Sequence, residues 1–307
     1  MMNMEEWLRY YEDCTLCPRN CHVNRLEGRK GRCKQSSSIY SARASLHQWE
    51  EPCISGTRGS GTIFFSGCSL GCVFCQNGNI ASGKAGFLVE IERLAEICLE
   101  QQARGAHNIN IVTGGHYIPS IVLAIKEAKR QGLTIPILYN TSSYEKVETL
   151  RLLEGIVDIW LPDFKYMDRQ MAKEYSNAPD YSEYAKKAIA EMVRQTKETI
   201  FDEDGIMQKG VIVRHLVLPK GVEDSKRIIK YLYETYGDGI YISIMNQYTP
   251  MEHLKTHPVL GRKITEEEYD EVVNYAIELG VENGFIQEED TALESFIPEF
   301  DGLGIIK

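Results

Sequence analysis

Three cysteines, Cys68, Cys72 and Cys75, lie within eight residues and have the type and spacing to hold an iron–sulfur cluster. A [4Fe–4S] cluster ligated only by protein normally takes four cysteines. No fourth cysteine lies nearby, because Cys53 is fifteen residues upstream and Cys98 falls on the apolar face of a predicted helix. We therefore predict a cluster with one iron open to an external ligand. The alternatives are a zinc site without its fourth ligand and three unrelated thiols.

The spacing Cys-x3-Cys-x2-Cys, with Phe74 before the last cysteine, resembles the signature of the radical S-adenosylmethionine (radical SAM) superfamily. The resemblance covers about residues 60–290. More narrowly, Cys17-Pro-Arg-Asn-Cys21, residues 54–61 and residues 161–165 look like the pyruvate formate-lyase activating enzyme-like branch. In that superfamily the open iron binds the amino and carboxylate groups of S-adenosylmethionine, and an electron from the cluster cleaves it to methionine and a 5′-deoxyadenosyl radical.

The resemblance also implies contacts to S-adenosylmethionine at the ends of successive strands. Gly114 and Gly115 resemble the Gly-Gly-Glu segment that receives the methionine amine, with His116 in place of the usual acid. Asp163 and Lys165 resemble the Asp-x-Lys element of the glycyl-radical activating enzymes. The full predicted set of cosubstrate contacts is Phe74, Gly114, Gly115, His116, Asn140, Ser142, Asp163, Lys165 and Arg214.

Several of these positions also have a plainer interpretation. Ser142 can cap a helix N-terminus, and a Gly-Gly pair alone indicates a loop. Arg214 can neutralise the methionine carboxylate or form a surface salt bridge. The role of the His116 side chain is left open, since backbone carbonyls can hold the amine instead. The recurrence of such positions at successive strand ends is what favours the site.

A second cysteine group lies near the N-terminus and supplies four thiols: Cys14, Cys17, Cys21 and Cys33. Four thiolates suit tetrahedral zinc or a second iron–sulfur cluster, and we favour structural zinc. His22 and His47 are spare candidate ligands, although a lone histidine is more often a hydrogen-bonded residue. Cys53 is expected to be a free buried thiol, with a role as an auxiliary ligand as the alternative.

Apolar strands alternate with helices after residue 60, which predicts βαβ units and a parallel sheet. A full eight-unit barrel takes about 250 residues, and part of this chain lies in loops. We therefore predict an α/β fold with a partial (β/α)6 parallel barrel over 61–307 and an irregular, Cys-rich N-terminal metal-binding module over 1–60. Predicted strands are 61–66, 108–113, 135–140, 156–160, 211–218 and 240–245, with 284–287 as a candidate seventh. Predicted helices are 89–104, 119–131, 144–153, 181–198, 224–236 and 266–279.

The composition limits the partners. A net charge of -10 would repel a phosphate backbone, which argues against general nucleic-acid binding. No stretch approaches the roughly 18 apolar residues of a membrane helix, and the acidic start is unlike a secretory signal. Clustered cysteines in a reducing compartment are more often metal ligands than disulfides. We therefore expect a cytoplasmic protein. The resemblance to the radical SAM superfamily implies in addition an electron donor such as flavodoxin or ferredoxin.

Three functional classes remain from the sequence. The first is a radical SAM enzyme that abstracts hydrogen from a glycyl-radical enzyme, a peptide or a small metabolite. The second is an iron–sulfur electron carrier without catalysis, which normally closes all four iron sites with protein ligands. The third is a zinc-stabilised interaction module, which the long βα pattern disfavours.

Overall fold

The computed structural model describes residues 3–287 and 298–306. Within these residues, seven parallel strands stand side by side in the order in which they occur along the chain. They are β2 (Ser60–Phe65), β4 (Ile109–Val112), β5 (Ile137–Thr141), β6 (Ile159–Pro162), β8 (Met207–Leu216), β9 (Tyr241–Met245) and β10 (Gly284–Ile286). In the described part of the chain the two ends of the sheet do not pair with each other, so the barrel is open.

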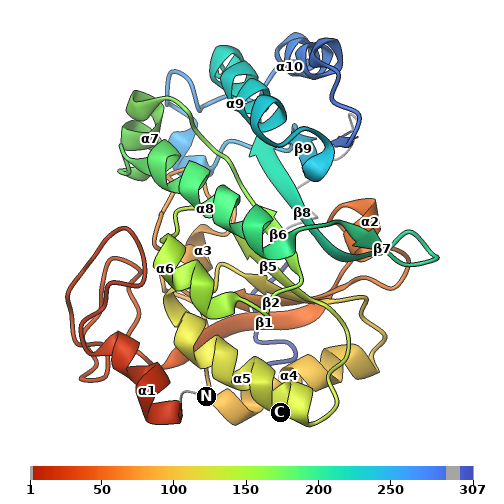
Figure 1. Cartoon of the computed structure of the whole chain (residues 1–307). Helices are drawn as coiled ribbons and strands as arrows, with labels where there is room; N and C mark the ends of the chain where they lie inside the picture. Colours follow the sequence, from red (N-terminus) through yellow and green to blue (C-terminus); the bar gives the residue numbers. More distant parts are fainter. Residues whose placement is uncertain (1–2, 288–297, 307) are drawn as a thin grey trace.

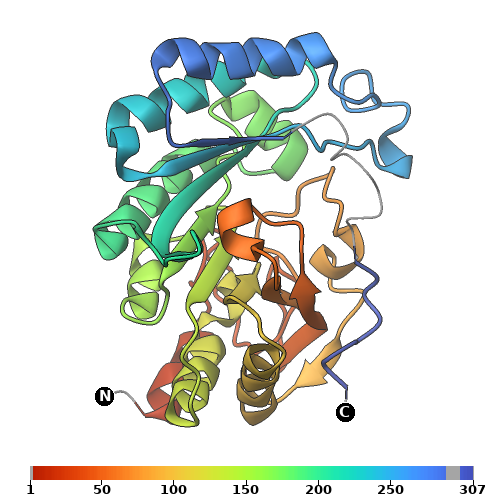
Figure 2. The ribbon, with the colours of Figure 1, turned by 90° about the vertical axis from the view of Figure 1, so that its right-hand side faces the viewer.

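Helices follow the strands and lie in an arc along the outer side of the curved sheet (Figure 1 and Figure 2). The helices of the arc are α4 (Ile91–Ala103), α5 (Ile118–Arg130), α6 (Val147–Leu150), α7 (Arg169–Ser176), α8 (Tyr181–Thr196), α9 (Val222–Tyr236) and α10 (Glu266–Leu279). Their ends carry recognisable caps: Asp168 accepts the Gln170 and Met171 N–H groups at the start of α7. The Thr265–Glu268 capping box starts α10.

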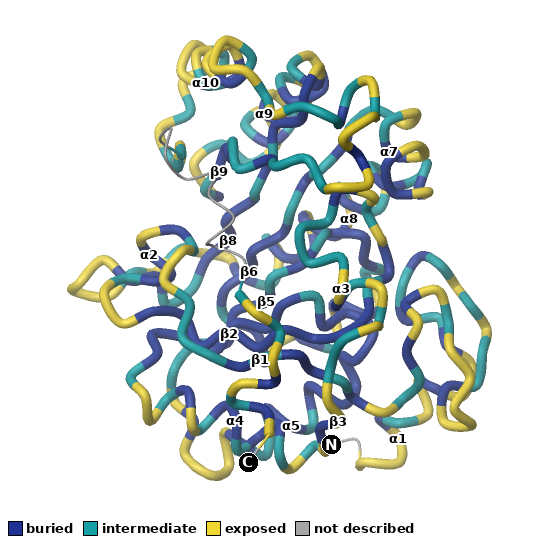
Figure 3. Tube along the Cα trace, turned by 180° about the vertical axis from the view of Figure 1, so that it is seen from behind, coloured by how far each residue is buried: buried dark blue, intermediate teal, exposed yellow. Residues whose placement is uncertain are grey.

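The central strands are covered on both faces, because β2, β4 and β6 are buried along their whole length. Figure 3 shows the buried residues concentrated along the strands and the exposed residues on the outer helices and loops. Continuous apolar runs such as Ile159–Leu161 are what a parallel sheet buried on both faces requires. The predicted α/β fold with an open, partial parallel barrel is confirmed, and the candidate strand at 284–287 is present as β10.

The region between Ser36 and Ser60, expected to be irregular, contains a long strand instead. β1 (Ile39–His47) pairs antiparallel with β2 and also with β3 (Phe87–Val89). A register shift between Ser41 and Arg43 places Ser41 and Ala42 both in the interior. This bulge interrupts the alternation of buried and exposed side chains, and the buried side chains are small. The sequence pattern of β1 is therefore weak, which explains the error.

Further short elements complete the described chain. They are α1 (Met4–Leu8), α2 (Pro52–Ser55), α3 (Gly78–Ala81), β7 (Ile200–Phe201) and the 3-10 turns Arg9–Tyr11, Gly115–Tyr117, Arg151–Leu153, Gly237–Gly239 and Glu252–Leu254. Because β1 adds to the same sheet as β2, residues before position 60 contribute to the barrel edge. The division at residue 60 into two domains stays a prediction. No described helix combines the length and apolar character needed to cross a membrane.

Helix α5 supplies a test of this packing. Ile125 on α5 is 1% exposed, whereas Ile277 on α10 is 61% exposed. Ile125→Ala should lower the free energy of unfolding by about 2–5 kcal/mol, because it removes buried apolar volume. Ile277→Ala, the same substitution in another helix, should change it by less than about 0.5 kcal/mol. Equal effects of the two variants in urea titrations would contradict this placement of α5.

Candidate functional site

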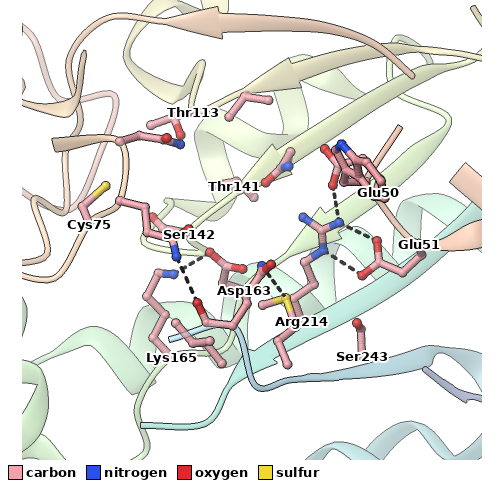
Figure 4. Close-up of a pocket in the computed structure, with 18 of the residues that line it drawn as sticks. Glu50, Glu51, Cys75, Thr113, Thr141, Ser142, Asp163, Lys165, Arg214 and Ser243 are labelled. Atoms are coloured by element: carbon pink, nitrogen blue, oxygen red, sulfur yellow. Dashed lines mark hydrogen bonds and ion pairs between the residues drawn. The ribbon is translucent and has the colours of Figure 1, made fainter. Parts of the chain in front are cut away.

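A cavity of about 630 Å³ lies at the carboxyl ends of the parallel strands. Its wall is formed by the loops after β2, β4, β5 and β6 and by the ends of β8 and β9. Because these strands are parallel, their carboxyl ends meet at one edge of the sheet. Cys75, Asp163, Lys165 and Arg214 gather around this space in Figure 4. Its volume is that of a typical small-molecule site, which makes it the candidate functional site.

The three closely spaced cysteines of the predicted cluster site all line this cavity: Cys68, Cys72 and Cys75. Gly67 and Gly71 carry them in the loop after β2 with φ angles of 91° and 70°, which a glycine adopts at little cost. Burial raises the pKa of the Cys68 thiol to about 11 and that of the Cys75 thiol to about 12. Without a metal, these two groups are therefore protonated at neutral pH.

The three thiols line one cavity and form a donor set that an iron–sulfur cluster can use. Among the described residues, no three His, Cys, Asp or Glu side chains are placed to hold one metal ion. In a cubane each cysteine binds a different iron, so the sulfurs surround a shared space and do not meet at one point. Of the cysteines that the structure describes, only these three line the cavity. The donor set therefore fits a [4Fe–4S] cluster with one iron free of protein ligands.

A buried ion pair lies next to the three thiols. Lys165 Nζ is 2.6 Å from Asp163 Oδ2, and each side chain is at most 20% exposed. Burial disfavours the charged lysine, but the Asp163 carboxylate and the sulfur of Cys72 outweigh it and raise the pKa of Lys165. The positive charge in turn lowers the pKa of Cys68 and Cys75, although burial has the larger effect. Lys165 thus favours thiolates in the cavity wall.

A tyrosine that the sequence did not single out ties two loops of the site together. The buried hydroxyl of Tyr181 lies 2.8 Å from the carbonyl oxygen of Ser142 and 2.9 Å from that of Asp163. It also accepts the backbone N–H of Lys165 at 3.0 Å. Asn140 and Ser142, both predicted contacts, line the cavity on the loop after β5. Tyr181 thereby positions the loops after β5 and β6 relative to each other.

The predicted amine-binding turn lies beside the cavity and not in its wall. Thr113 lines the cavity, but Gly114, Gly115 and His116 do not. Thr113 has a φ of 57°, which is uncommon for a residue with a Cβ and typical of strained functional loops. His116 Nε2 lies 2.8 Å from the carbonyl oxygen of Ser66, and burial lowers the pKa of His116 to about 3. The role of this turn in holding the amine stays a prediction.

A buried carboxyl group, Glu145, packs directly against the same turn. A Cβ at Gly115 would lie 2.6 Å from Glu145 Oε1, so only glycine fits there. Oε1 accepts the hydroxyls of Tyr139 and Thr141 at 3.0 and 2.7 Å, while Oε2 has no hydrogen-bond partner among the residues that the structure describes. Burial raises the pKa of Glu145 to about 7, although the two hydrogen bonds act to lower it.

Arg214 lines the cavity, but its guanidinium is already paired. Its Nε lies 2.8 Å from Glu51 Oε1, and one terminal nitrogen binds both Glu50 and Glu51. Burial opposes the charge of Arg214, but the two carboxylates outweigh it and raise the pKa of Arg214. Binding the methionine carboxylate would require Arg214 to leave one of these partners. That predicted contact therefore stays a prediction, and Glu50 and Glu51 join the cavity wall.

The N-terminal thiols lie outside this cavity. None of the four lines it: Cys14, Cys17, Cys21 and Cys33. His22, proposed as a spare ligand, contacts Asp13 at 2.9 Å near the surface. His47 does line the cavity, whereas Cys53 is buried outside its wall. Whether the N-terminal group binds a metal stays a prediction.

Sequence reasoning missed several residues of the site or its support: Glu50, Glu51, Thr113, Thr141, Glu145, Tyr181 and Ser243. Thr113 and Thr141 directly flank predicted residues, so their position at strand ends was an available signal. Glu50 and Glu51 fall in the segment expected to be irregular. Arg214 is 163 residues from Glu51 in the chain, and no local pattern connects two such positions.

The model of the radical SAM superfamily matches residues 62–203 of this chain. This stretch contains the three cavity cysteines and the Asp163–Lys165 pair. Over this stretch, somewhat less than half of its length, the chain is similar to the radical SAM superfamily. Arg214 and the N-terminal cysteines lie outside the matched residues.

An uncharacterized protein of Methanocaldococcus jannaschii is 29% identical over 274 residues, which cover 87% of this chain and 75% of that protein. Among solved structures, a domain of pyruvate-formate lyase-activating enzyme from Bacteroides vulgatus is 16% identical. It aligns with a TM-score of 0.39 over 56% of this chain and 92% of its own. Native anSMEcpe with bound AdoMet is 10% identical, with a TM-score of 0.49 over 69% of this chain and 57% of its own.

The buried Glu145 predicts a pH dependence of stability. Its pKa is raised from an ordinary 4.5 to about 7, so the folded chain binds more protons than the unfolded chain between these values. Stability should therefore fall as the pH rises through this window, by up to about 3 kcal/mol. Glu145→Gln, which stays neutral, should lack this loss. Urea unfolding of both proteins at pH 5 and pH 8 measures it, and identical pH dependences would contradict the prediction.

Proposed function

We propose that this protein is a radical SAM enzyme that abstracts a hydrogen atom from its substrate. A bound [4Fe–4S] cluster would supply the electron that cleaves S-adenosylmethionine to methionine and a 5′-deoxyadenosyl radical. The observation that carries the proposal is that Cys68, Cys72 and Cys75 line one cavity together with the Asp163–Lys165 pair. The superfamily match to residues 62–203 supports the same chemistry.

The side chains of the cavity have separate roles in this proposal. The three thiolates hold the cluster, and Lys165 offsets part of their negative charge. Asp163, with Asn140 and Ser142, offers oxygen and nitrogen atoms for the ribose and amino-acid groups of S-adenosylmethionine. Charge-assisted contacts of this kind gain strength in a cavity from which water is excluded.

The substrate enters the proposal only as a class. Two versions are consistent with the cavity: abstraction from a backbone glycine of a glycyl-radical enzyme, and modification of a peptide or small metabolite. A one-electron donor such as flavodoxin or ferredoxin is needed in either version, because the cluster must be reduced before each cleavage. A cytoplasmic location fits this requirement, since such donors and an oxygen-sensitive cluster work in a reducing compartment.

Loss of one cavity cysteine should abolish the activity. Cys68→Ala should eliminate formation of 5′-deoxyadenosine by the anaerobically reconstituted, dithionite-reduced protein, because three ligands are the minimum for this cluster. Cys98→Ala is the matched control, since Cys98 is a fully buried thiol on α4 outside the cavity. The readouts are the iron content and the amount of 5′-deoxyadenosine.

Two outcomes would contradict the proposal. Normal 5′-deoxyadenosine formation by Cys68→Ala would show that the cluster lies elsewhere. A wild-type protein that takes up and reduces a cluster but never cleaves S-adenosylmethionine would instead be an electron carrier.

The polar wall of the cavity predicts a binding defect without a cluster defect. Asp163→Asn removes the charge partner of Lys165 and one acceptor for the cosubstrate. Hydrogen bonds to charged groups contribute about 1.5–3 kcal/mol, so the Kd for S-adenosylmethionine should rise roughly 10- to 150-fold. Equilibrium binding to the oxidised, reconstituted protein measures this, with iron content unchanged. Asp270→Asn, on the exposed side of α10, is the control. An unchanged Kd for Asp163→Asn would remove this residue from the site.

A further inference from the structure

Arg25 is a buried arginine in the N-terminal segment, at 0% exposure. Its guanidinium donates to the carbonyl oxygen of Ser36 at 2.6 and 3.2 Å and to that of His116 at 2.6 Å. It also lies 4.6 Å from the ring centre of Tyr11 and 5.6 Å from that of Tyr117. The hydrogen bonds use three of the five guanidinium N–H groups, and all of these contacts are with neutral groups.

A buried cation without a counter-charge is costly, because the interior solvates it poorly. In the part of the chain that the structure describes, no carboxylate forms an ion pair with Arg25. Burial raises the pKa of Tyr11, so this phenol stays neutral. The remaining neighbours that can carry negative charge are sulfurs. Arg25 donates to Cys14 Sγ at 3.7 Å and interacts electrostatically with Cys33.

The loop around the N-terminal cysteines also places a hydrogen-bond donor next to a cysteine sulfur. The backbone N–H of Arg32 donates to Cys21 Sγ at 3.2 Å. A Cβ at Gly31 would lie 3.1 Å from the same sulfur, so glycine is what lets this segment approach Cys21 so closely. Hydrogen bonds from N–H groups to sulfur are stronger when the sulfur is an anion. These hydrogen bonds would gain strength when a bound metal converts the thiols to thiolates.

We propose that Cys14, Cys17, Cys21 and Cys33 form a second metal centre of four thiolates, with Arg25 as its buried counter-cation. A doubly charged metal ion bound by four thiolates keeps an excess of negative charge, and so does an iron–sulfur cluster with four cysteines. Arg25 offsets part of either charge. Binding releases the thiol protons to water and requires no oxidant or reductant.

The centre would form by movement of the more exposed cysteines. Cys14 and Cys33 are buried, whereas Cys17 and Cys21 are only partly so. No three such ligands of the described chain surround one ion point, so Cys17 and Cys21 must turn inward for zinc, or a polynuclear cluster must span the four sulfurs. A zinc ion and an iron–sulfur cluster would both be bound by the same four thiolates, and metal analysis distinguishes the two.

Arg25 also connects this centre to the candidate active site. It holds the carbonyl oxygen of His116, whose ring lies 2.8 Å from the carbonyl oxygen of Ser66, two residues before Cys68. The carbonyl oxygen of Cys33 approaches Gly67 so closely that a Cβ there would lie 2.6 Å from it. The proposed N-terminal centre would thus support the loop after β2, which carries Cys68, Cys72 and Cys75. The inference does not depend on the proposed catalytic function.

The first test removes the three cysteines that line the cavity. The full-length chain with Cys68→Ala, Cys72→Ala and Cys75→Ala is prepared with zinc sulfate, or anaerobically with ferrous iron and sulfide. Metal analysis should find about one zinc, or about four irons with matching sulfide, per chain. A further Cys21→Ala change should remove this metal. A triple variant that is folded by circular dichroism but metal-free would overturn the proposal.

The second test addresses Arg25 in the same triple background. Arg25→Gln should weaken metal binding roughly 10- to 100-fold in a chelator competition, as loss of an outer partner of a metal site does. The control is Arg29→Gln, the same change four residues along at a side chain that is 69% exposed. Equal affinities of these two variants would overturn the role of Arg25. Arg25→Lys keeps the positive charge but loses part of the hydrogen bonding, so it should retain more of the metal affinity than Arg25→Gln, and equal affinities of these two variants would also overturn that role.

Discussion

The constraint on which the structure depends is that its parallel strands lie in chain order. Each strand is followed by a loop at the same edge of the sheet, so residues from six different strands meet there without any long connection. The helices that return the chain cover only the outer face. Because the sheet stays open, the inner face leaves room for a cavity of about 630 Å³.

The charged side chains of that cavity form two separate sets of ion pairs. Lys165 pairs with Asp163 on one side, and Arg214 pairs with Glu50 and Glu51 on the other. Each cation therefore remains charged in spite of burial, because a carboxylate compensates the lost hydration. The difference between the two groups lies in their neighbours. Lys165 interacts with the thiols, whereas Arg214 lines the cavity near the ends of β8 and β9.

The N-terminal segment and the barrel are connected by buried polar contacts. Arg25 reaches the turn after β4, and the Tyr117 hydroxyl donates to Gln35 at 2.9 Å. Arg19 binds backbone carbonyls on the cysteine loop and at the end of α7, including those of Leu70 and Ser176. These guanidinium contacts leave few ways for the segment to move independently of the site, since each bond would have to be replaced by water.

The sequence by itself determined the alternation of strands and helices and the three-cysteine loop, because periodicity and spacing are local properties. It also indicated Asp163 and Lys165, which follow directly from the end of β6. Strand β1 was not predicted from the sequence, because a bulge and small side chains obscure its alternating pattern. Only the tertiary structure decided that Arg214 is paired with Glu50 and Glu51, that Tyr181 joins two loops, and that Gly115 faces Glu145. Those contacts join residues from different loops and strands, and their geometry is set by how the sheet curves, which no local pattern encodes.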